Sequence, residues 1–301
     1  MEIKDLQFFK DKDICDCDLQ DDKYIVNTNS GKYIVEIYEG DLESFLNLNK
    51  RNNNLLYELN DKFTKIEDSG FENGHTFVIK KYIQNLTEQI NPIKQIELGN
   101  EVGKVLRKLH DNSQIDDDTT WSKIFNYKIN NLIYNYSMTN FRGEKDYIVF
   151  DYIESNRYLI DSRKLSNIYL FDNIGSIYAD DNNLNFVSKN ISYMADSFYE
   201  FRKINEVNEN SRIFYYSLLK SYFNGKIPRL FYRILAIYSI LDILEPKLNE
   251  SNEVDLTQEF DRILKIYNDF DCIIPVWVKE TEEKIKELGD EGKLEVLVWR
   301  W

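Results

Sequence analysis

The chain has 301 residues, of which 43% are hydrophobic, and its formal net charge is -14. This length and apolar content allow one large domain or two lobes with a substantial core, and they exclude a disordered chain. No apolar run reaches the about 18 residues of a membrane span, so we expect no membrane partner. Because the negative charge would repel a phosphate backbone, we also expect no nucleic acid partner.

The N-terminal residues and the cysteines indicate in which cellular compartment the protein is expected. The first thirteen residues, MEIKDLQFFKDKD, are charged from the second residue onward and lack the apolar stretch of a secretory signal. The cysteines, Cys15, Cys17 and Cys272, are odd in number, which argues against a disulfide framework. Both features favour a cytoplasmic protein. Cys15 and Cys17 resemble half of a metal site, but His75 and His110 are isolated, so we expect no zinc centre.

The first ninety residues favour strands. Runs rich in β-branched and aromatic residues are bounded by turn signals, and Asn29-Ser30-Gly31 is typical of a hairpin. One segment instead shows apolar residues at helical spacing. In chain order we predict strands at 23–28 and 32–38, a helix at 42–59, a turn at 71–75 and a strand at 75–83.

From Pro92 onward the spacing of apolar residues is helical. We predict helices from Pro92 to His110, and at 121–136, 145–162, 212–223, 229–244 and 256–268. Between residues 165 and 187, short β-like runs are divided by Asp/Asn/Gly clusters that are typical of turns. The sequence therefore predicts an α+β protein with a β-rich lobe at 1–84, containing one helix, and a larger, mainly helical lobe at 85–301.

Four local strings occur in an order that is informative about the family. They are EVGKVLRKLH at 101–110, DSFYEF at 196–201, YFNGKIPRLF at 222–231 and IPVW at 274–277. Together they resemble strings of the aminoglycoside phosphotransferase and choline kinase families. The resemblance spans nearly the whole chain, and it rests on the shared order and spacing. It implies a two-lobed, protein-kinase-like fold with a small antiparallel β lobe.

Active members of such a family transfer a phosphoryl group from ATP with the help of Mg²⁺. Their chemistry needs a lysine on the third strand, a catalytic Asp in an H-G-D-x-x-x-x-N loop, the Asn of that loop on magnesium, and a second metal-binding Asp. Without these cations the developing negative charge has little to stabilise it. ATP and Mg²⁺ are therefore the cofactors that an active protein would need.

The resemblance places different residues at these positions in this chain. The strand position that is basic in the family corresponds to Glu36. Counting back from Asp196, the metal-binding Asp corresponds to Ser188, and the loop Asn to Ser176. The catalytic Asp corresponds to Phe171. In this alignment all four functional positions are lost.

A second alignment takes residues 160–167 as the catalytic loop. Asn167 is then retained and Asp180 becomes the second metal ligand, but the catalytic Asp is replaced by Ser162. We prefer the first alignment, because the second leaves Asp180 too far from Asp196. In neither alignment is the position of the catalytic Asp occupied by a residue that could act as a base.

Neighbouring acids offer a third interpretation. Asp172 lies beside the lost base, and Asp180 or Asp181 could supply metal oxygens, although these residues also suit turns. Lys80, Lys81, Tyr82 and Ile83 resemble the hinge between the lobes, where the backbone of Lys81, Tyr82 and Ile83 would contact adenine. We expect the lysine side chains there to be solvated.

His110 is expected to bond carbonyl groups at the end of its own helix or to cap that helix. The many Tyr and Phe residues are expected to pack in the core.

The sequence supports three hypotheses. The first is a pseudokinase that keeps the fold and binds an unknown small molecule or protein partner. The second is an active ATP-dependent phosphotransferase of a small hydroxylated substrate, using relocated acids. The third is a protein-interaction module that docks through its acidic surface or through the apolar tail at 294–301. An acidic surface would suit a cationic molecule or a basic protein.

Overall fold

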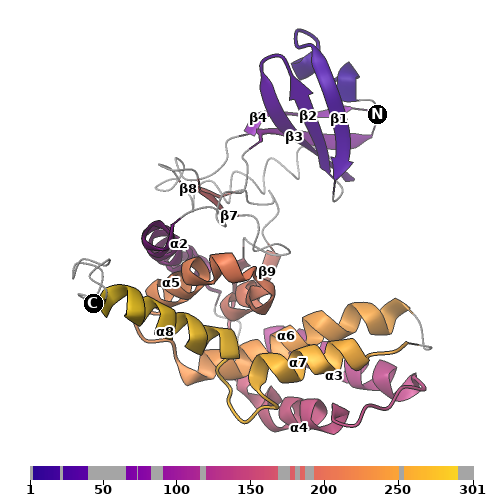
Figure 1. Cartoon of the computed structure of the whole chain (residues 1–301). Coiled ribbons are helices and arrows are strands. Elements are labelled where there is room, and N and C mark those ends of the chain that lie inside the picture. The colour runs from indigo at the N-terminus through magenta and orange to yellow at the C-terminus, as the bar shows by residue number, and fades with distance from the viewer. Residues whose placement is uncertain are drawn as a thin grey trace. The chain divides into compact units, whose positions relative to one another are not determined.

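The computed structural model divides the chain into two compact units (Figure 1). It describes residues 3–20, 23–39, 66–72, 74–82, 91–115, 120–168, 177–179, 184–186, 193–250 and 254–290. Unit 1 comprises Met1–Leu86 and Gly175–Ser192, and unit 2 comprises Thr87–Ile174 and Tyr193–Trp301. The boundary that we expect from the sequence, after residue 84, stays a prediction.

Unit 1 contains a five-stranded antiparallel sheet with the strand order β1-β2-β3-β5-β4. The strands are β1 (Ile14–Gln20), β2 (Lys23–Thr28), β3 (Gly31–Glu39), β4 (Ile66–Glu72) and β5 (His75–Lys81). The predicted hairpin joins β2 to β3, with Thr28 paired to Gly31. Gly31 has a φ of 145°, which residues with a side chain rarely adopt. A second, two-stranded sheet in this unit pairs β7 (Ile177–Ala179) with β8 (Leu184–Phe186).

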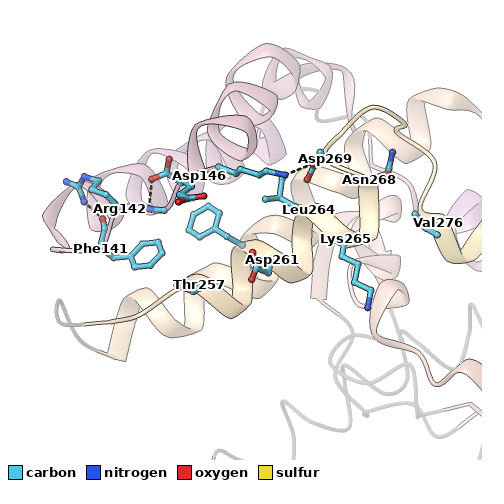
Figure 2. A pocket seen from close by; sticks show the side chains of 14 residues that line it. Phe141, Arg142, Asp146, Thr257, Asp261, Leu264, Lys265, Asn268, Asp269 and Val276 are labelled. Carbon is cyan, nitrogen blue, oxygen red and sulfur yellow. Dashed lines mark hydrogen bonds and ion pairs between the residues drawn. The ribbon is translucent and has the colours of Figure 1, made fainter.

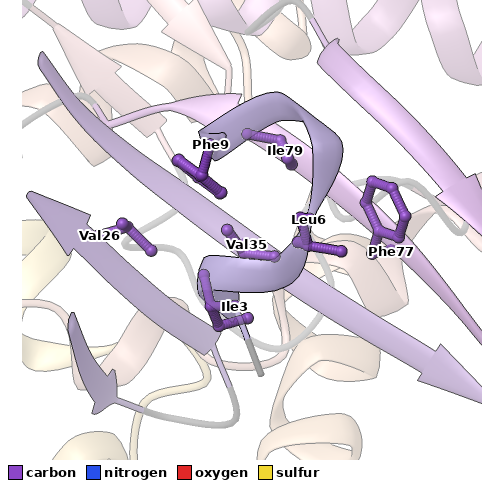
Figure 3. Packing of buried hydrophobic residues seen from close by; sticks show 7 residues of the cluster. All are labelled: Ile3, Leu6, Phe9, Val26, Val35, Phe77 and Ile79. Carbon is purple, nitrogen blue, oxygen red and sulfur yellow. The ribbon is translucent and has the colours of Figure 1, made fainter. Parts of the chain in front are cut away.

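Two short 3-10 helices at the N-terminus, η1 (Ile3–Asp5) and η2 (Gln7–Phe9), cover one face of the large sheet. Figure 3 shows their apolar side chains over those of three strands. The buried cluster contains Ile3, Leu6, Phe9, Val26, Val35, Phe77 and Ile79. Because successive side chains of a strand point to opposite faces, Glu36 and Lys80 lie on the other face, next in sequence to Val35 and Ile79.

Unit 2 is mainly helical (Figure 1). Its helices are α2 (Pro92–Ser113), α3 (Thr120–Met138), α4 (Asp146–Asn156), α5 (Arg212–Tyr222), α6 (Arg229–Glu250), α7 (Thr257–Tyr267) and α8 (Val276–Asp290). Shorter 3-10 helices are η4 (Arg157–Ser162), η6 (Ser197–Phe201), η7 (Ile204–Glu206) and η8 (Glu209–Ser211). A two-stranded antiparallel sheet pairs β6 (Leu165–Ile168) with β9 (Tyr193–Asp196).

Helices α2 and α5 pack closely because two glycines of α2 face α5. A Cβ atom added at Gly99 would overlap the carbonyl oxygen of Phe214, and one added at Gly103 would overlap that of Leu218. The hydroxyl of Ser221 donates a 2.7 Å hydrogen bond to the carbonyl oxygen of Asn100 across the same contact. Gly103 belongs to the string at 101–110, so this part of the string has a packing role.

The predicted α+β, two-lobed fold class is confirmed, with differences in detail. The helix expected at 145–162 is α-helical only to Asn156 and continues as the 3-10 helix η4. Strands β1 and β4 were not predicted. The helix at 42–59 and the tail at 294–301 lie outside the described residues. Among the helices that the structure describes, none has the length and apolarity needed to cross a membrane.

Candidate functional site

Only some of the residues selected from the sequence fall in the described part of the chain. Glu36 lies in β3, Lys81 ends β5, and Tyr82 follows it. Seven further residues lie outside the described residues, and their assigned roles stay predictions. They are Ile83, Phe171, Asp172, Ser176, Asp180, Asp181 and Ser188.

The second alignment required a catalytic loop at 160–167. In the structure, this segment contains the end of η4 and most of β6. Ser162 is exposed, and its hydroxyl donates to the carbonyl oxygen of Leu159 at 3.2 Å. Asn167 pairs with Met194 of β9. The segment therefore does not form the loop that this alignment assumes.

The proposed hinge residues continue the pairing of β5 with β3. The backbone amide of Tyr82 donates a 2.8 Å hydrogen bond to the carbonyl oxygen of Lys32. The ammonium group of Lys32 lies 4.1 Å from the centre of the Tyr82 ring, and Lys81 is exposed. The Tyr82 amide is thus used inside unit 1, so a ligand would have to displace Lys32 to bond with it.

The carboxylate of Glu36 is buried between two lysines from neighbouring strands. Lys80 of β5 places its Nζ atom 2.8 Å from Oε2, and Lys23 of β2 places its Nζ atom 3.2 Å from Oε1. We call these three residues the Glu36 cluster. The Lys80 side chain is only 1% exposed, so the expectation that it is solvated is wrong.

Burial and pairing act in opposite directions on Lys80. Burial lowers the pKa of its ammonium group, and the nearby Glu36 carboxylate raises it. Two opposite charges in a medium of low dielectric stabilise each other, and each becomes costly when the other is removed. The sequence gives only a weak indication of this arrangement. Lys80 follows the apolar residues Val78 and Ile79, which indicates a buried strand but does not identify the partner of the lysine.

Asp196, the first residue of the string at 196–201, is fully buried in unit 2 and accepts hydrogen bonds at both oxygens. Arg163 donates to Oδ2 at 2.9 Å and to Oδ1 at 2.7 Å. The Tyr238 hydroxyl donates to Oδ2 at 2.7 Å, and it accepts a 2.8 Å hydrogen bond from Trp121 Nε1. The amide of Phe198 donates to Oδ1 at 3.2 Å. Asp196 thus connects β9 and η6 to side chains of α3 and α6.

His110 is buried and connects three of the four strings. Its Nδ1 atom lies 2.8 Å from the hydroxyl of Tyr222, and its Nε2 atom lies 3.1 Å from the carboxylate of Glu200. The expectation that His110 bonds its own helix end is wrong, because α2 continues to Ser113 and the ring turns toward η6 and α5. Burial raises the pKa of the Tyr222 hydroxyl well above its usual value.

The fourth string is joined to the same unit through Trp277. The indole Nε1 atom of Trp277 donates to Asn205 Oδ1 at 2.9 Å. The amide nitrogen of Asn205 in turn donates to the hydroxyls of Tyr267 and Ser239 at 2.9 and 3.0 Å. Each of the four strings thus contributes at least one polar side chain to contacts that hold unit 2 together.

Figure 2 shows a pocket of about 840 Å³ between the start of α4, helix α7 and the turn after α7. The rings of Phe141 and Phe260 are stacked there at 5.9 Å, and Lys145 forms a 2.7 Å ion pair with Asp269. Val276 of the fourth string lines this pocket, but none of the candidate catalytic, metal-binding or hinge residues does. Within the described ranges, no group of three or more His, Cys, Asp or Glu residues could hold a metal ion.

No protein-family model matches the sequence, and no curated protein matches it significantly. Solved structures do match. An aminoglycoside phosphotransferase from Alicyclobacillus acidocaldarius has 8% identity, covers 91% of this chain and 93% of its own, and superposes with a TM-score of 0.58. A choline/ethanolamine kinase family protein from Mesorhizobium loti has 11% identity, coverage of 89% and 92%, and a TM-score of 0.55.

A third similar structure is the phosphotransferase APH(2'')-IIa in a ternary complex with streptomycin and ATP. It has 15% identity, covers 83% of this chain and 91% of its own, and has a TM-score of 0.53. Identities this low show the fold and not the activity. The chain thus has the fold of the aminoglycoside phosphotransferases and choline kinases, as the four strings indicated.

Proposed function

We propose that this chain is a phosphotransferase-like protein that does not transfer phosphoryl groups and acts by binding a small molecule or a protein partner. The observation that carries this proposal is the Glu36 cluster. The resemblance implies a phosphate-holding cation on the third strand, and in this chain the third strand carries the Glu36 carboxylate. A carboxylate adds negative charge where the oxygens of a triphosphate would need a cation.

The first alignment supports the same proposal. With Phe171, Ser176 and Ser188 at the catalytic and metal-binding positions, the chain would lack a base and both magnesium ligands. Magnesium neutralises the charge that develops during phosphoryl transfer, so its loss would remove a large part of the catalysis.

Calorimetric titration of the full chain with Mg-ATP tests this proposal. We expect no saturable heat at nucleotide concentrations up to about 1 mM, which corresponds to a binding free energy weaker than about 4 kcal/mol. Titration with magnesium alone is the control for metal binding elsewhere. Micromolar binding of Mg-ATP would contradict the proposal.

One observation favours an active phosphotransferase as the second candidate. Lys23 is partly exposed and is held by Glu36, so a cation from the neighbouring strand remains beside the acidic position. In this alternative, Asp172 acts as the base and Asp180 or Asp181 binds Mg²⁺. The substrate would be a small hydroxylated and cationic molecule, in keeping with the net charge of -14.

A phosphotransfer assay on amine-bearing sugars and amino alcohols separates the two candidates. Activity that is lost in both Asp172→Asn and Lys23→Met, but kept in Lys32→Met, would support the active enzyme. Lys32 lies on the same sheet and provides a matched control for the loss of one positive charge. We expect no activity in any of these proteins.

We also propose a cytoplasmic location and no nucleic acid partner. The three cysteines are free thiols, and Cys15 and Cys17 are exposed, which suits a reducing compartment. The acidic composition disfavours contact with phosphate backbones. Retention on heparin or DNA columns at physiological salt would contradict the second statement.

A further inference from the structure

The pocket shown in Figure 2 is formed by unit 2 alone. One face of α7 lines it, where Phe260, Asp261, Leu264 and Lys265 follow one another at intervals of three and four residues. The segment from Phe141 to Asp146, which leads into α4, lines it as well. At about 840 Å³ the pocket has the size of a small-molecule site.

The turn after α7 forms part of the pocket wall and has a strained backbone. Asn268, Asp269 and Phe270 have φ angles of 50°, 53° and 62°, so three successive residues with side chains adopt the left-handed conformation. This conformation is unfavourable for residues that have a Cβ atom, although Asn and Asp tolerate it better than Phe does. Strained backbone persists only where the surrounding structure holds it, and it is concentrated at functional sites. Asn268 and Asp269 both line the pocket.

Side chains on both sides of the strained turn hold it in place. The ring of Phe270 stacks on those of Tyr152 and Tyr267, at centroid distances of 4.2 and 5.1 Å. Lys145, immediately before α4, forms a 2.7 Å ion pair with Asp269. The wall is therefore formed in the absence of a ligand, which reduces the cost of ordering the pocket when a ligand binds.

The charges of the lining favour a cationic ligand. Among the lining residues, four carboxylates oppose three basic groups, and these are Glu144, Asp146, Asp261 and Asp269 against Arg142, Lys145 and Lys265. Two of the basic groups are already engaged, since Lys145 pairs with Asp269 and Arg142 donates to the carbonyl oxygen of Thr139 at 2.9 Å. Asp269 and, to a smaller extent, Asp261 raise the pKa of the Lys145 ammonium group, so these acids stabilise a cation in the pocket.

Aromatic rings lie beside these acids. Phe141 and Phe260 line the pocket and are stacked nearly parallel, with centroids 5.9 Å apart and an angle of 11° between the planes. Figure 2 shows Phe141, Asp146 and Asp261 around the same end of the pocket. Carboxylates and the faces of aromatic rings both attract an ammonium group, and the rings also provide an apolar surface.

We propose that this pocket binds a small organic amine with an aromatic body, with the ammonium group at Asp261 and the body against Phe141 and Phe260. The inference gives a ligand class to the binding role proposed above. A chain that bound Mg-ATP would keep the same pocket, so the two proposals fail separately.

Saturation-transfer NMR of the full chain with tryptamine tests the proposal. We expect saturable binding with a dissociation constant of about 1 mM or below, as suits a ligand of this size. Tryptophol carries a neutral hydroxyl in place of the ammonium group, and indole-3-propionate carries a carboxylate. Both should bind at least about fivefold more weakly than tryptamine, because neither supplies the positive charge.

The acidic contact is tested by Asp261→Asn, which removes the charge and keeps the shape of the side chain. This variant should bind tryptamine about fivefold more weakly and tryptophol as the wild type does. Asp151→Asn, at an exposed acid of α4 that does not line the pocket, makes the same change in net charge. It should bind tryptamine like the wild type.

The aromatic contact is tested by Phe141→Leu, which should weaken the binding of tryptamine several-fold because one ring face is lost. Tyr147→Leu, at an exposed tyrosine outside the pocket, is the matched control and should have no effect. Far-UV circular dichroism confirms that each variant is folded.

Four results would overturn the proposal. They are the absence of saturable tryptamine binding up to about 10 mM, equal affinities for tryptamine and tryptophol, equal weakening in Asp261→Asn and Asp151→Asn, and unchanged binding in Phe141→Leu.

Discussion

Glu36 holds two ammonium groups on a face of the sheet where Ile25, Ile34 and Val78 are also buried. Such an arrangement is stable only while both signs of charge are present, because each buried charge relies on the other to offset the loss of water. The cluster therefore makes Glu36 a structural residue of unit 1, whatever else it does.

Replacing Glu36 by Ala should lower the free energy of unfolding of unit 1 by about 3–5 kcal/mol, since Lys80 would keep its buried charge without this carboxylate. Urea denaturation followed by far-UV circular dichroism measures the effect. Glu97→Ala, which removes an exposed pair with Lys94, should cost less than about 1 kcal/mol. Equal losses in the free energy of unfolding for the two substitutions would show that the Glu36 cluster stabilises unit 1 no more than an exposed ion pair does.

Tyr238→Phe should destabilise unit 2 by about 1–3 kcal/mol, because the hydroxyl both donates to Asp196 and accepts from Trp121 in a buried place. Tyr147→Phe, at an exposed position, is the matched control and should change the urea midpoint little. The cost should vanish in the background of Asp196→Asn if the hydroxyl acts chiefly through that carboxylate. Additive costs would contradict this coupling.

Contacts of this kind could not be predicted from the sequence. The partners of His110 lie 90 and 112 residues away along the chain, so no local sequence pattern predicts these contacts. The same holds for Lys80, because its pairing with Glu36 depends on the register of β3 and β5. The sequence could identify these residues as members of strings or strands, but not the side chains that they would meet.

The packing of α2 against α5 depends on glycine at position 103. Gly103→Ala should destabilise unit 2 by about 1–3 kcal/mol, although alanine is the better helix former, because its methyl group would overlap the carbonyl oxygen of Leu218. Lys104→Ala, at the next and exposed position of the same helix, should be nearly neutral. Thermal unfolding of the three proteins measures this difference. A Gly103→Ala variant as stable as the wild type would show that the helices can separate at little cost.

Helix α7 begins beside a carboxylate that bonds its first residue. Asp255 Oδ1 accepts hydrogen bonds from the amide and the hydroxyl of Thr257 at 2.9 and 2.7 Å, and these bonds lower the pKa of Asp255. A carboxyl group whose pKa is lower in the folded state stabilises the fold above its unfolded pKa, and this effect disappears as the pH falls through the folded pKa.

Asp255→Ala should therefore lower the urea midpoint at pH 7, and the difference from the wild type should shrink as the pH drops below about 4. Asp271→Ala, which removes an exposed acid outside the helix, controls for net charge. A difference that persists unchanged into acid would mean that the carboxylate is not the cause.

At the scale of elements, the sequence predicted the centre of the sheet better than its edges. The hairpin of β2 and β3 alternates and turns as expected, whereas β1 and β4 form the two edges of the sheet. Strand β1 carries acids and exposed cysteines, and of its residues only Ile14 is described as packing against the buried cluster, so no alternating pattern is visible in the sequence. Strand β4 contains Gly70, which leaves room for the Phe77 ring. In the sequence, a glycine at this place indicates a turn and not a strand.

For the whole molecule, the distribution of tryptophan separates the two units. Both tryptophans that the structure describes, Trp121 and Trp277, belong to unit 2, and the other two, Trp299 and Trp301, fall in its range. Each unit has a core of its own and can unfold with its own midpoint. Tryptophan fluorescence should therefore report unit 2 alone.

We expect Glu36→Ala to lower the midpoint of the circular-dichroism transition that belongs to unit 1 and to leave the midpoint of tryptophan fluorescence unchanged. Tyr238→Phe should lower the fluorescence midpoint and leave the unit 1 transition unchanged. Equal shifts of both signals in either variant would show that the units unfold as one.

The fold of the whole molecule could be predicted because the four strings keep their order along the chain. The catalytic assignments could not be tested in the same way, since they depend on counting from Asp196 across turns where the sequence has no regular spacing. The hypothesis of lost activity therefore rests most firmly on Glu36, which lies in a strand of defined register.

The engagement of His110, Asp196, Glu200 and Trp277 in internal contacts has a consequence for what the four strings indicate. Residues that hold helices together are under selection for stability, whether or not the chain carries out a reaction. The strings that they form therefore record the fold and say little about the chemistry.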